Sequence, residues 1–327
     1  MTHLSKPTLI SGTQSTGNLH IGNYLGALKN FVELQNSGKY NCFFFIADYH
    51  SITIDFDPKK KAEEILLVAR AYLAAGLDPK KSTLFVQSHI PASTELGWIF
   101  TAITPLGELE RMTQFKDKMA RQASNIDAGL LIYPALMAAD IALYDAQAVP
   151  VGDDQLQHLE LTRTIVRKFN NKFGKTFVEP QPLLTKTPRI MSLDDPTKKM
   201  SKTLPLGCLF LDSASDRIEM QIKSAVTDSG SDIRFDQKNK AGVSNLLTIY
   251  SALSGQSMPT LEKKYLGKGY GAFKAELIDV VTKALKPFRE TKVSDAKIKT
   301  MLASGAKKAK KVAELKMKEV RKKIGLL

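Results

Sequence analysis

Cysteine is scarce in this chain, which has only Cys42 and Cys208 among its 327 residues. The two do not form a C-x-x-C pair, so neither a disulfide framework nor a cysteine zinc site is expected. Cys42 opens the apolar run CFFFIA, where it is most simply a small buried residue. The cysteine content therefore predicts a reducing compartment and no structural metal.

Long apolar runs are missing as well. No uninterrupted apolar segment reaches the roughly 18 residues that a membrane helix requires. The N-terminal stretch MTHLSKPTL lacks the apolar core of a signal peptide. Together these absences predict a cytoplasmic protein that has no membrane partner.

Acidic residues are outnumbered, because 33 Asp and Glu stand against 47 Lys and Arg and leave a net charge of +14. A surplus of this size indicates a polyanionic partner, of which nucleic acid is the first candidate. Residues 305–327 hold nine basic residues against two acidic ones. A solvated helix face explains such a run as readily as contact with an RNA backbone does, so both interpretations stay open.

Residues 8–35 have the pattern of a strand, a loop and a helix. Thr8 to Ile10 is a short apolar strand, residues 11–18 are small and polar, and apolar residues recur at helical spacing from Ile21 onward. The first N–H groups of a helix lack intrahelical partners and its dipole favours an anion, so this unit suits a phosphate group. The glycines that permit close approach of a ligand are Gly12, Gly17 and Gly22.

The rest of the N-terminal half alternates strands with helices. Residues 41–47 form a continuous apolar run, as expected of a parallel strand covered on both faces. Further strands are expected at residues 83–87, 148–151 and 189–192. This alternation predicts an α/β fold with a Rossmann-type, doubly wound parallel sheet. From Ala214 onward only helical periodicity appears, which predicts a second, all-helical domain.

Ligands of such sheets bind at the carboxyl ends of the strands. We therefore expect one crevice to be lined by Ile10, Gln14, Asp48, His50, Gln87 and Ser88. Gly152, Asp153 and Asp154 follow the strand at 148–151, where acidic residues commonly accept hydrogen bonds from ribose hydroxyls. Asp153 could equally cap the helix that follows.

Asp140 is the only charged residue in the helical stretch AGLLIYPALMAADIALY. It shares a helix face with Tyr133, Met137 and Tyr144. A carboxylate among apolar neighbours costs several kcal/mol unless it is paired or hydrogen-bonded. Asp140 therefore either meets a cation across the core or accepts a hydrogen bond from a ligand.

Two segments carry lysines that a cleft could use. In the charged helix at 106–118, Gln114 and Lys118 share a face because they are four residues apart, although a solvated face explains them as well. Residues 196–203, PTKKMSKT, combine proline, lysines and a serine without periodicity, which is typical of a mobile loop.

Two short motifs resemble the signatures of class I aminoacyl-tRNA synthetases. His20 to Asn23, HIGN, resembles the His-x-Gly-His tetrapeptide, and Lys199 to Thr203, KMSKT, resembles Lys-Met-Ser-Lys-Ser. Taken alone, the first motif is more often only a helix cap formed by His20. Longer segments between Ile10 and about Phe288, such as YPALMAADIALY and VPVGDDQLQHLELTR, are similar to the bacterial tryptophanyl-tRNA synthetases. The tyrosine enzymes share both signatures and are the nearest alternative.

The resemblance implies that tryptophan is activated by Mg-ATP to tryptophanyl-adenylate and transferred to tRNA(Trp). It also implies a Rossmann catalytic domain at residues 1–192, a helical anticodon-recognition domain at 193–300, and a homodimer. The basic C-terminal helix at 301–327 could pack back on the catalytic domain. A non-catalytic relative that only binds RNA is the contrasting interpretation, and the intact signature lysines argue against it.

Residue by residue, the resemblance places the tryptophan pocket at Ile10, His50, Tyr133, Met137, Asp140, Val149, Val151 and Gln155. ATP contacts fall on Gln14, Ser15, Thr16, Gly22, Asn23, Gly152, Asp153, Asp154, Ile190, Lys199, Met200, Ser201, Lys202 and Thr203. The catalytic group is expected to be His20, Lys118, Lys199, Ser201 and Lys202. Two residues depart from the family pattern, because Thr203 stands where serine is usual and Ile10 replaces a frequent aromatic.

Overall fold

The structure is a computed structural model that describes residues 6–121, 127–184 and 188–326, with only the backbone at residues 117, 118, 120 and 121. Within these ranges a parallel sheet has the strand order β3-β2-β1-β4-β5. Its strands are β1 (Thr8–Gln14), β2 (Asn41–Ala47), β3 (Ser82–Val86), β4 (Ala148–Val151) and β5 (Gln181–Leu184). The strand order reverses at β1, which pairs with β2 on one side and β4 on the other, and this confirms the doubly wound prediction.

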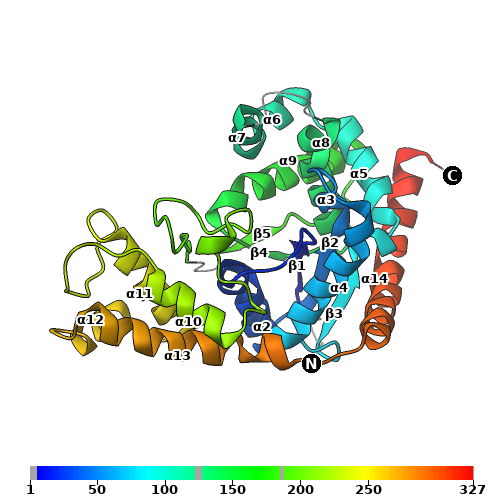
Figure 1. Cartoon of the computed structure of the whole chain (residues 1–327). Helices are drawn as coiled ribbons and strands as arrows, with labels where there is room; N and C mark the ends of the chain where they lie inside the picture. The colour runs from blue at the N-terminus through cyan, green and yellow to red at the C-terminus, as the bar shows by residue number, and fades with distance from the viewer. Residues whose placement is uncertain (1–5, 122–126, 185–187, 327) are drawn as a thin grey trace, which may run out of the picture.

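The helices surround this sheet and extend beyond it on one side (Figure 1). Their bounds are α1 (Ile21–Asn23), η1 (Tyr24–Leu28), α2 (Lys29–Asn36), α3 (Asp48–Ser51), α4 (Pro58–Ala75), η2 (Gln87–His89), α5 (Ala92–Ile103), α6 (Leu106–Glu110), α7 (Thr113–Arg121), α8 (Ala128–Ala142), η3 (Asp153–Gln155), α9 (Leu156–Phe173), η4 (Pro205–Gly207), α10 (Ser215–Ser224), α11 (Ala241–Ser254), α12 (Met258–Lys264), α13 (Gly269–Glu290) and α14 (Asp295–Ile324). The segment η1 is one π-helical stretch within an otherwise continuous helix from residue 21 to residue 36.

Side chains of β2 alternate between two hydrophobic clusters. Cys42 and Phe44 join the cluster that contains residues of α1, α2 and α4, whereas Phe43 and Phe45 join the one that contains residues of α5, α8, α9 and α14. All four side chains are buried. The continuous apolar run is therefore explained by helices on both faces of the sheet, as the sequence predicts.

The prediction of the last strand at residues 189–192 is wrong. The fifth strand is β5, whose Pro182 and Leu184 give it little strand character, as an edge position tolerates. Met191 instead forms an isolated antiparallel bridge with Lys199. Its N–H donates to Asn245 Oδ1 at 2.8 Å and its carbonyl accepts from Asn245 Nδ2 at 2.9 Å. These partners satisfy the backbone that a sheet would otherwise have satisfied.

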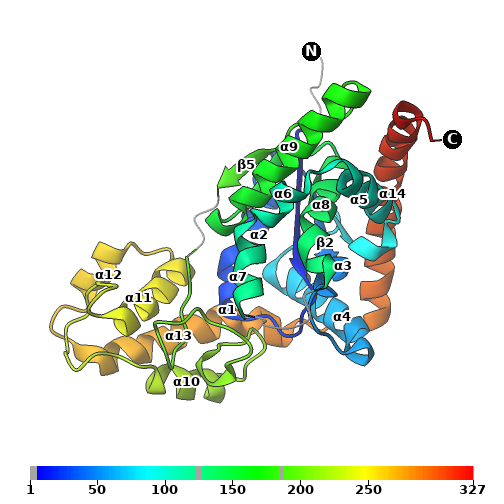
Figure 2. The ribbon, with the colours of Figure 1, turned by 90° about the horizontal axis from the view of Figure 1, so that it is seen from above.

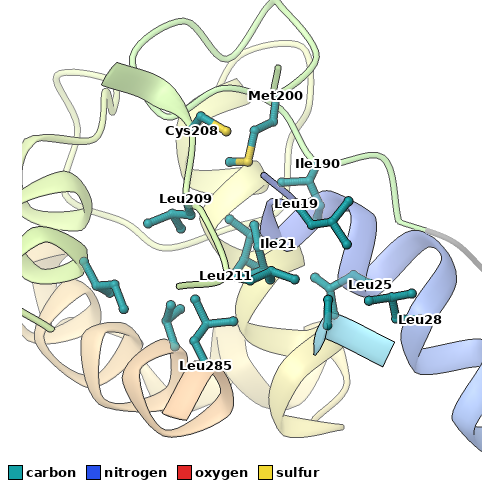
Figure 3. Packing of buried hydrophobic residues seen from close by; sticks show 14 of the residues in the cluster. Leu19, Ile21, Leu25, Leu28, Ile190, Met200, Cys208, Leu209, Leu211 and Leu285 are labelled. Carbon is teal, nitrogen blue, oxygen red and sulfur yellow. The ribbon is translucent and has the colours of Figure 1, made fainter. Parts of the chain in front are cut away.

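Helices α10 to α13 form the helical region that extends away from the sheet (Figure 2). A hydrophobic cluster joins it to the first helix of the sheet region, and Ile21, Leu209 and Leu285 lie together there (Figure 3). Met200 of the lysine loop is buried in the same cluster. The buried side chain of Met200 therefore anchors the loop, whereas Lys199 and Lys202 beside it are more exposed.

Helix α14 packs against the edge strand β3 (Figure 1). It also contacts α4, where Asp295 forms an ion pair with Arg70. It runs unbroken from Asp295 to Ile324, so the boundary expected between residues 300 and 301 falls inside one helix. Its small residues face the sheet, and a Cβ added at Gly305 would lie 1.8 Å from the carbonyl oxygen of Leu84. Only glycine permits this close approach of helix and strand.

Gly305→Ala is expected to lower the free energy of unfolding by about 3 kcal/mol, because the added methyl group must push α14 off the backbone of β3. Gly271→Ala is the matched control, since Gly271 lies in α13 with nothing within 4 Å of an added Cβ. That control is expected to stabilise by about 0.5 kcal/mol. Denaturant unfolding measures both, and equal stabilities for the two variants would contradict the close seating of α14.

Candidate active site

The first signature lies at the start of the helix that follows β1. His20 is the N-cap, its Nδ1 accepts from the N–H of Gly22 at 3.1 Å, and Asn23 Oδ1 accepts from the N–H of His20 at 3.0 Å. These two bonds satisfy donors that the helix itself leaves unpaired. The capping interpretation of His20 is therefore confirmed, and the same ring also borders a cavity described below.

Burial, together with the charges of Lys202 and Lys199, lowers the pKa of His20 from 6.5 to about 4. Between about pH 4 and pH 6.5, His20 is therefore protonated in the unfolded chain but neutral in the folded one. Stability contributed by the neutral ring is complete above pH 6.5 and is lost as the pH falls toward 4.

His20→Asn keeps a capping side chain and removes this titration, so it is expected to flatten the fall in unfolding free energy below pH 6.5. His89→Asn, at an exposed histidine, is the control and is expected to keep the wild-type slope. Denaturant unfolding at several pH values measures the difference. Identical slopes for wild type and His20→Asn would contradict the buried neutral ring.

A cavity of about 490 Å³ opens at the carboxyl ends of β1 and β4. The residues expected to surround tryptophan all border it, namely Ile10, His50, Tyr133, Met137, Asp140, Val149, Val151 and Gln155. They come from five elements that are far apart in the sequence, β1, α3, α8, β4 and η3. The crossing point of the doubly wound sheet brings them together.

Asp140 lies on the wall of this cavity and is 2% exposed. Its Oδ2 accepts from His50 Nε2 at 2.9 Å and from Gln87 Nε2 at 2.7 Å, and Ser93 also hydrogen-bonds the carboxyl group. Burial raises the pKa of Asp140, and the hydrogen bonds oppose that rise. The sequence left open a cation across the core or a donor on a ligand, and the protein partners that the structure shows are the side chains of His50, Gln87 and Ser93.

Gln87 holds its amide in a defined orientation. Its Oε1 accepts from the N–H of Tyr49 at 3.1 Å, which turns its amide N–H groups toward Asp140. Gln87 follows β3 and does not itself border the cavity, while Asp48 accepts from the N–H groups of Tyr49 and Ser88. The predicted crevice is therefore correct for Ile10, Gln14 and His50, whereas Asp48, Gln87 and Ser88 lie behind its wall.

Tyr133, which also borders this cavity, forms part of a second hydrogen-bond network. Its hydroxyl lies 2.7 Å from His158 Nε2 and donates to Gln114 Oε1 at 3.2 Å. Gln114 Nε2 in turn donates to the carbonyl of Asp154 at 3.1 Å. These bonds connect α7, α8 and η3 around the cavity.

A second cavity of about 720 Å³ adjoins the first, and the residues that border both are Ser11, Gly12, Pro150, Val151, Asp154 and Gln155. Among the residues expected to contact ATP, those that border it are Gly22, Asn23, Gly152, Asp153, Asp154, Ile190 and Lys199. A Cβ at Gly22 would lie 2.9 Å from the His20 ring, so this position has no room for a side chain. Asp153 makes no capping hydrogen bond with η3 or α9, which leaves its carboxylate exposed beside the cavity.

The other expected ATP residues lie around this cavity rather than on its wall. Gln14 borders the first cavity, and Ser15 is fully buried with its hydroxyl 3.2 Å from that of Ser51. Lys202 Nζ donates to both the carbonyl and the hydroxyl of Thr16, the latter at 2.6 Å. The hydroxyls of Ser201 and Thr203 lie 2.9 Å apart. Lys118 belongs to α7, but its side chain lies outside the described part of the chain.

Several site residues escaped prediction. Gln87 was expected at the crevice but not as a donor to Asp140, and nothing in the sequence indicated Ser93. Lys61 and Glu64 of α4 lie beside the first loop without a motif to mark them. The Lys61–Glu64 pair is one helical turn apart, but the contacts of Gln87 with Asp140 and of Lys61 with Ser15 join residues 53 and 46 positions apart, a spacing that no periodic rule predicts.

Among the described residues, no group of three or more His, Cys, Asp or Glu side chains is placed to hold a metal ion. In the same ranges no helix is both long and apolar enough to cross a membrane.

The chain matches the family model of the class I tRNA synthetases for tryptophan and tyrosine over residues 3–286. It is 49% identical to the tryptophan–tRNA ligase of Oceanobacillus iheyensis over 325 residues, which cover 98% of each chain. Its structure is similar to that of the Mycoplasma pneumoniae tryptophanyl-tRNA synthetase, with a TM-score of 0.89, 38% identity and 98% coverage of each chain.

A structure of the Campylobacter jejuni tryptophanyl-tRNA synthetase in complex with ADP and tryptophan is also similar. The TM-score is 0.82 at 36% identity, and the alignment covers 98% of this chain and all of the other. Both signatures, the doubly wound sheet and relatives matched along almost their whole length agree with one another. The chain therefore belongs to the bacterial tryptophanyl-tRNA synthetases.

Proposed function

We propose that this chain activates L-tryptophan with ATP to form tryptophanyl-adenylate and pyrophosphate, and then transfers the aminoacyl group to tRNA(Trp). The observation that carries the proposal is the pair of adjoining cavities at the crossing point of the sheet, one with a buried acceptor and one beside a capped helix start. Two substrates placed in them would meet at Gly12, which borders both.

Asp140 is the group that recognises the indole ring. A carboxylate offers about four lone-pair sites. Three donors occupy sites on Asp140, namely His50, Gln87 and Ser93, so one site remains for the indole N–H. Phenylalanine has no donor for that site and would leave the acceptor unpaired, which supports strong discrimination. Val149 and Val151 supply apolar surface for the ring.

ATP occupies the second cavity. The backbone at Gly22 and the exposed carboxylates of Asp153 and Asp154 suit the nucleoside, and Ile190 suits the adenine ring. Lys199, Lys202 and Lys118 neutralise the charge that develops on pyrophosphate. Mg²⁺ enters with the phosphates of ATP. Lys202 does not border the second cavity, because its ammonium group is bonded to Thr16. The lysine loop must therefore move toward the phosphates when the nucleotide binds.

The reaction needs alignment more than proton transfer. The carboxylate of tryptophan is already ionised and attacks the α-phosphorus in line, so neither a general base nor a covalent enzyme intermediate is required. Catalysis rests on holding the two reactants in line and on stabilising the charge that moves to the leaving pyrophosphate. The neutral ring of His20 cannot add positive charge at pH 7, because burial lowers its pKa to about 4. Its role is to hold the helix start and to border the nucleotide.

The tRNA contacts two parts of the chain, the helical region α10 to α13 and the basic helix α14. Helices α10 to α13 at residues 215–290 provide the anticodon-recognition region, within the expected range 193–300. The exposed lysines of α14 face away from the sheet and suit an RNA backbone, namely Lys307, Lys308, Lys310, Lys311 and Lys318. Lys316, Arg321 and Lys323 of α14 are engaged internally instead, as Lys316 is with Asp145 at 2.8 Å and Arg321 is with Glu95. Aminoacylation of tRNA serves translation, which assigns the protein to the cytoplasm.

The chain acts as a homodimer. Helix α5 leaves Trp98 71% exposed, and Leu106 at the start of α6 is 59% exposed. Exposed tryptophan is enriched at subunit interfaces relative to the rest of a protein surface, which supports the proposal. Sedimentation at several protein concentrations tests the dimer, and Trp98→Glu is expected to give monomers.

Pyrophosphate exchange without tRNA tests the proposed reaction directly. The chain is expected to exchange label into ATP with tryptophan and at least about a hundredfold less with tyrosine or phenylalanine. Preferred use of tyrosine would favour the tyrosine enzyme instead. Absence of exchange with every amino acid, together with retained tRNA binding, would favour the non-catalytic RNA-binding relative.

A further inference from the structure

Helix α4 places a charged pair beside the first signature loop and outside both cavities. Lys61 Nζ lies 2.8 Å from Glu64 Oε2, one helical turn away. It also donates to the carbonyl of Ser15 at 3.0 Å and contacts the hydroxyl of Ser51 at 3.1 Å. An ammonium group has three N–H donors, so Lys61 uses all of them in this arrangement.

Lys61 ties together two segments that carry the site. Ser15 belongs to the loop after β1, and Ser51 ends α3, the turn that also carries His50. The pair is only partly accessible, with side chains 16% and 21% exposed for Lys61 and Glu64. The ammonium group of Lys61 therefore holds the loop after β1 against the end of α3, and the carboxylate of Glu64 balances its charge.

The second oxygen of Glu64 lies beside the turn at Gly17, which Lys202 also approaches. A Cβ added at Gly17 would lie 3.7 Å from Glu64 Oε1 and 4.0 Å from Lys202 Nζ, so both charged groups converge on the same turn. Lys202 is held there by the carbonyl and hydroxyl of Thr16. The loop at residues 15–17 thus has an ammonium group at Ser15, another at Thr16 and the carboxylate of Glu64 beside Gly17.

We propose that Glu64 is a positioning residue that keeps the lysine loop in a waiting state, by attracting Lys202 to the turn at Thr16 and Gly17 until phosphate groups draw it away. The inference rests on the proposed role of Lys202 toward pyrophosphate. It explains why Lys202, which is proposed to bind pyrophosphate, donates hydrogen bonds to the two oxygens of Thr16 in this structure. It also assigns a use to a charged pair that lines neither cavity.

The electrostatics of Lys202 agree with this assignment. Burial lowers its pKa, Glu64 opposes that shift, and Lys61 adds to it. Without the carboxylate, two cations would remain at one turn with no counter-charge close by. The waiting state would then be less populated, and the loop would leave the turn more often.

Glu64→Gln tests the role of the charge, because glutamine keeps an oxygen that can accept from Lys61. Glu63→Gln is the matched control, since Glu63 is the exposed neighbour on the same helix. Trypsin is added to the ligand-free chain, and cleavage after Lys199 and after Lys202 is followed by mass spectrometry. Glu64→Gln is expected to be cleaved at these bonds roughly threefold faster, and Glu63→Gln at the wild-type rate.

A kinetic measurement separates positioning from a structural role. In pyrophosphate exchange, Glu64→Gln is expected to lower the KM for ATP roughly threefold, because less of the protein waits in the tethered state, and to leave kcat within about twofold. A raised KM together with a lower thermal midpoint would overturn the proposal, and so would equal behaviour of the two variants in both assays. Lack of exchange in the wild type would instead refute the proposed function, while the proteolysis comparison would still judge the waiting state.

Discussion

Asp140→Asn is expected to lower kcat/KM for tryptophan by at least about a hundredfold and to weaken discrimination against phenylalanine. Asparagine has the same size, but it replaces one acceptor oxygen with an NH₂ donor. His50 Nε2 and Gln87 Nε2 both donate to Oδ2, so the asparagine oxygen is expected to stay toward them and the NH₂ group to take the place of Oδ1. The indole N–H would then meet a donor instead of an acceptor, while the pocket walls stay in place.

Ser93→Ala is the control for this variant, because it removes one donor to Asp140 and leaves the carboxylate intact. Its effect on kcat/KM is expected to stay within about tenfold. Tryptophan-dependent pyrophosphate exchange and a circular dichroism spectrum of each variant provide the comparison. If Asp140→Asn activated tryptophan as efficiently as the wild type, the assignment of Asp140 to the indole would fail.

Lys202→Ala is the second substitution with a large expected effect. Its kcat for pyrophosphate exchange is expected to fall on the order of a hundredfold or more, because a charge that stabilises the transition state is removed. The KM for tryptophan is expected to change little, since the first cavity does not include Lys202. A fall in kcat without a change in tryptophan KM would mark a contact made in the transition state.

Lys198→Ala is the matched control in the same loop. Lys198 is exposed and forms its ion pair with Asp195 at 2.9 Å, away from both cavities. Substituting it is expected to change kcat by less than about twofold. Equal activities of Lys202→Ala and the wild type would show that the lysine loop does not act through Lys202.

Local patterns explain how much of the fold was predictable. The apolar run at residues 41–47 became β2 because helices bury both of its faces, and HIGN became a capped helix start because its side chains bond to their own backbone. The apolar run is visible in the sequence itself, and the cap depends on contacts within a few residues, so both could be predicted. The strand at residues 181–184 was missed for the opposite reason, since its identity comes from pairing with β4 rather than from its own composition.

The sequence by itself determined the class of sheet, the two signatures and an acid on an apolar helix, because each follows from short-range spacing or from a motif. Only the tertiary structure decided what surrounds these groups. The donors to Asp140 come from residues 50, 87 and 93, and the tether of Lys202 comes from residue 16. These pairs form because the fold brings distant segments together where the strand order of the sheet reverses, and no periodicity in the sequence predicts which segments meet there.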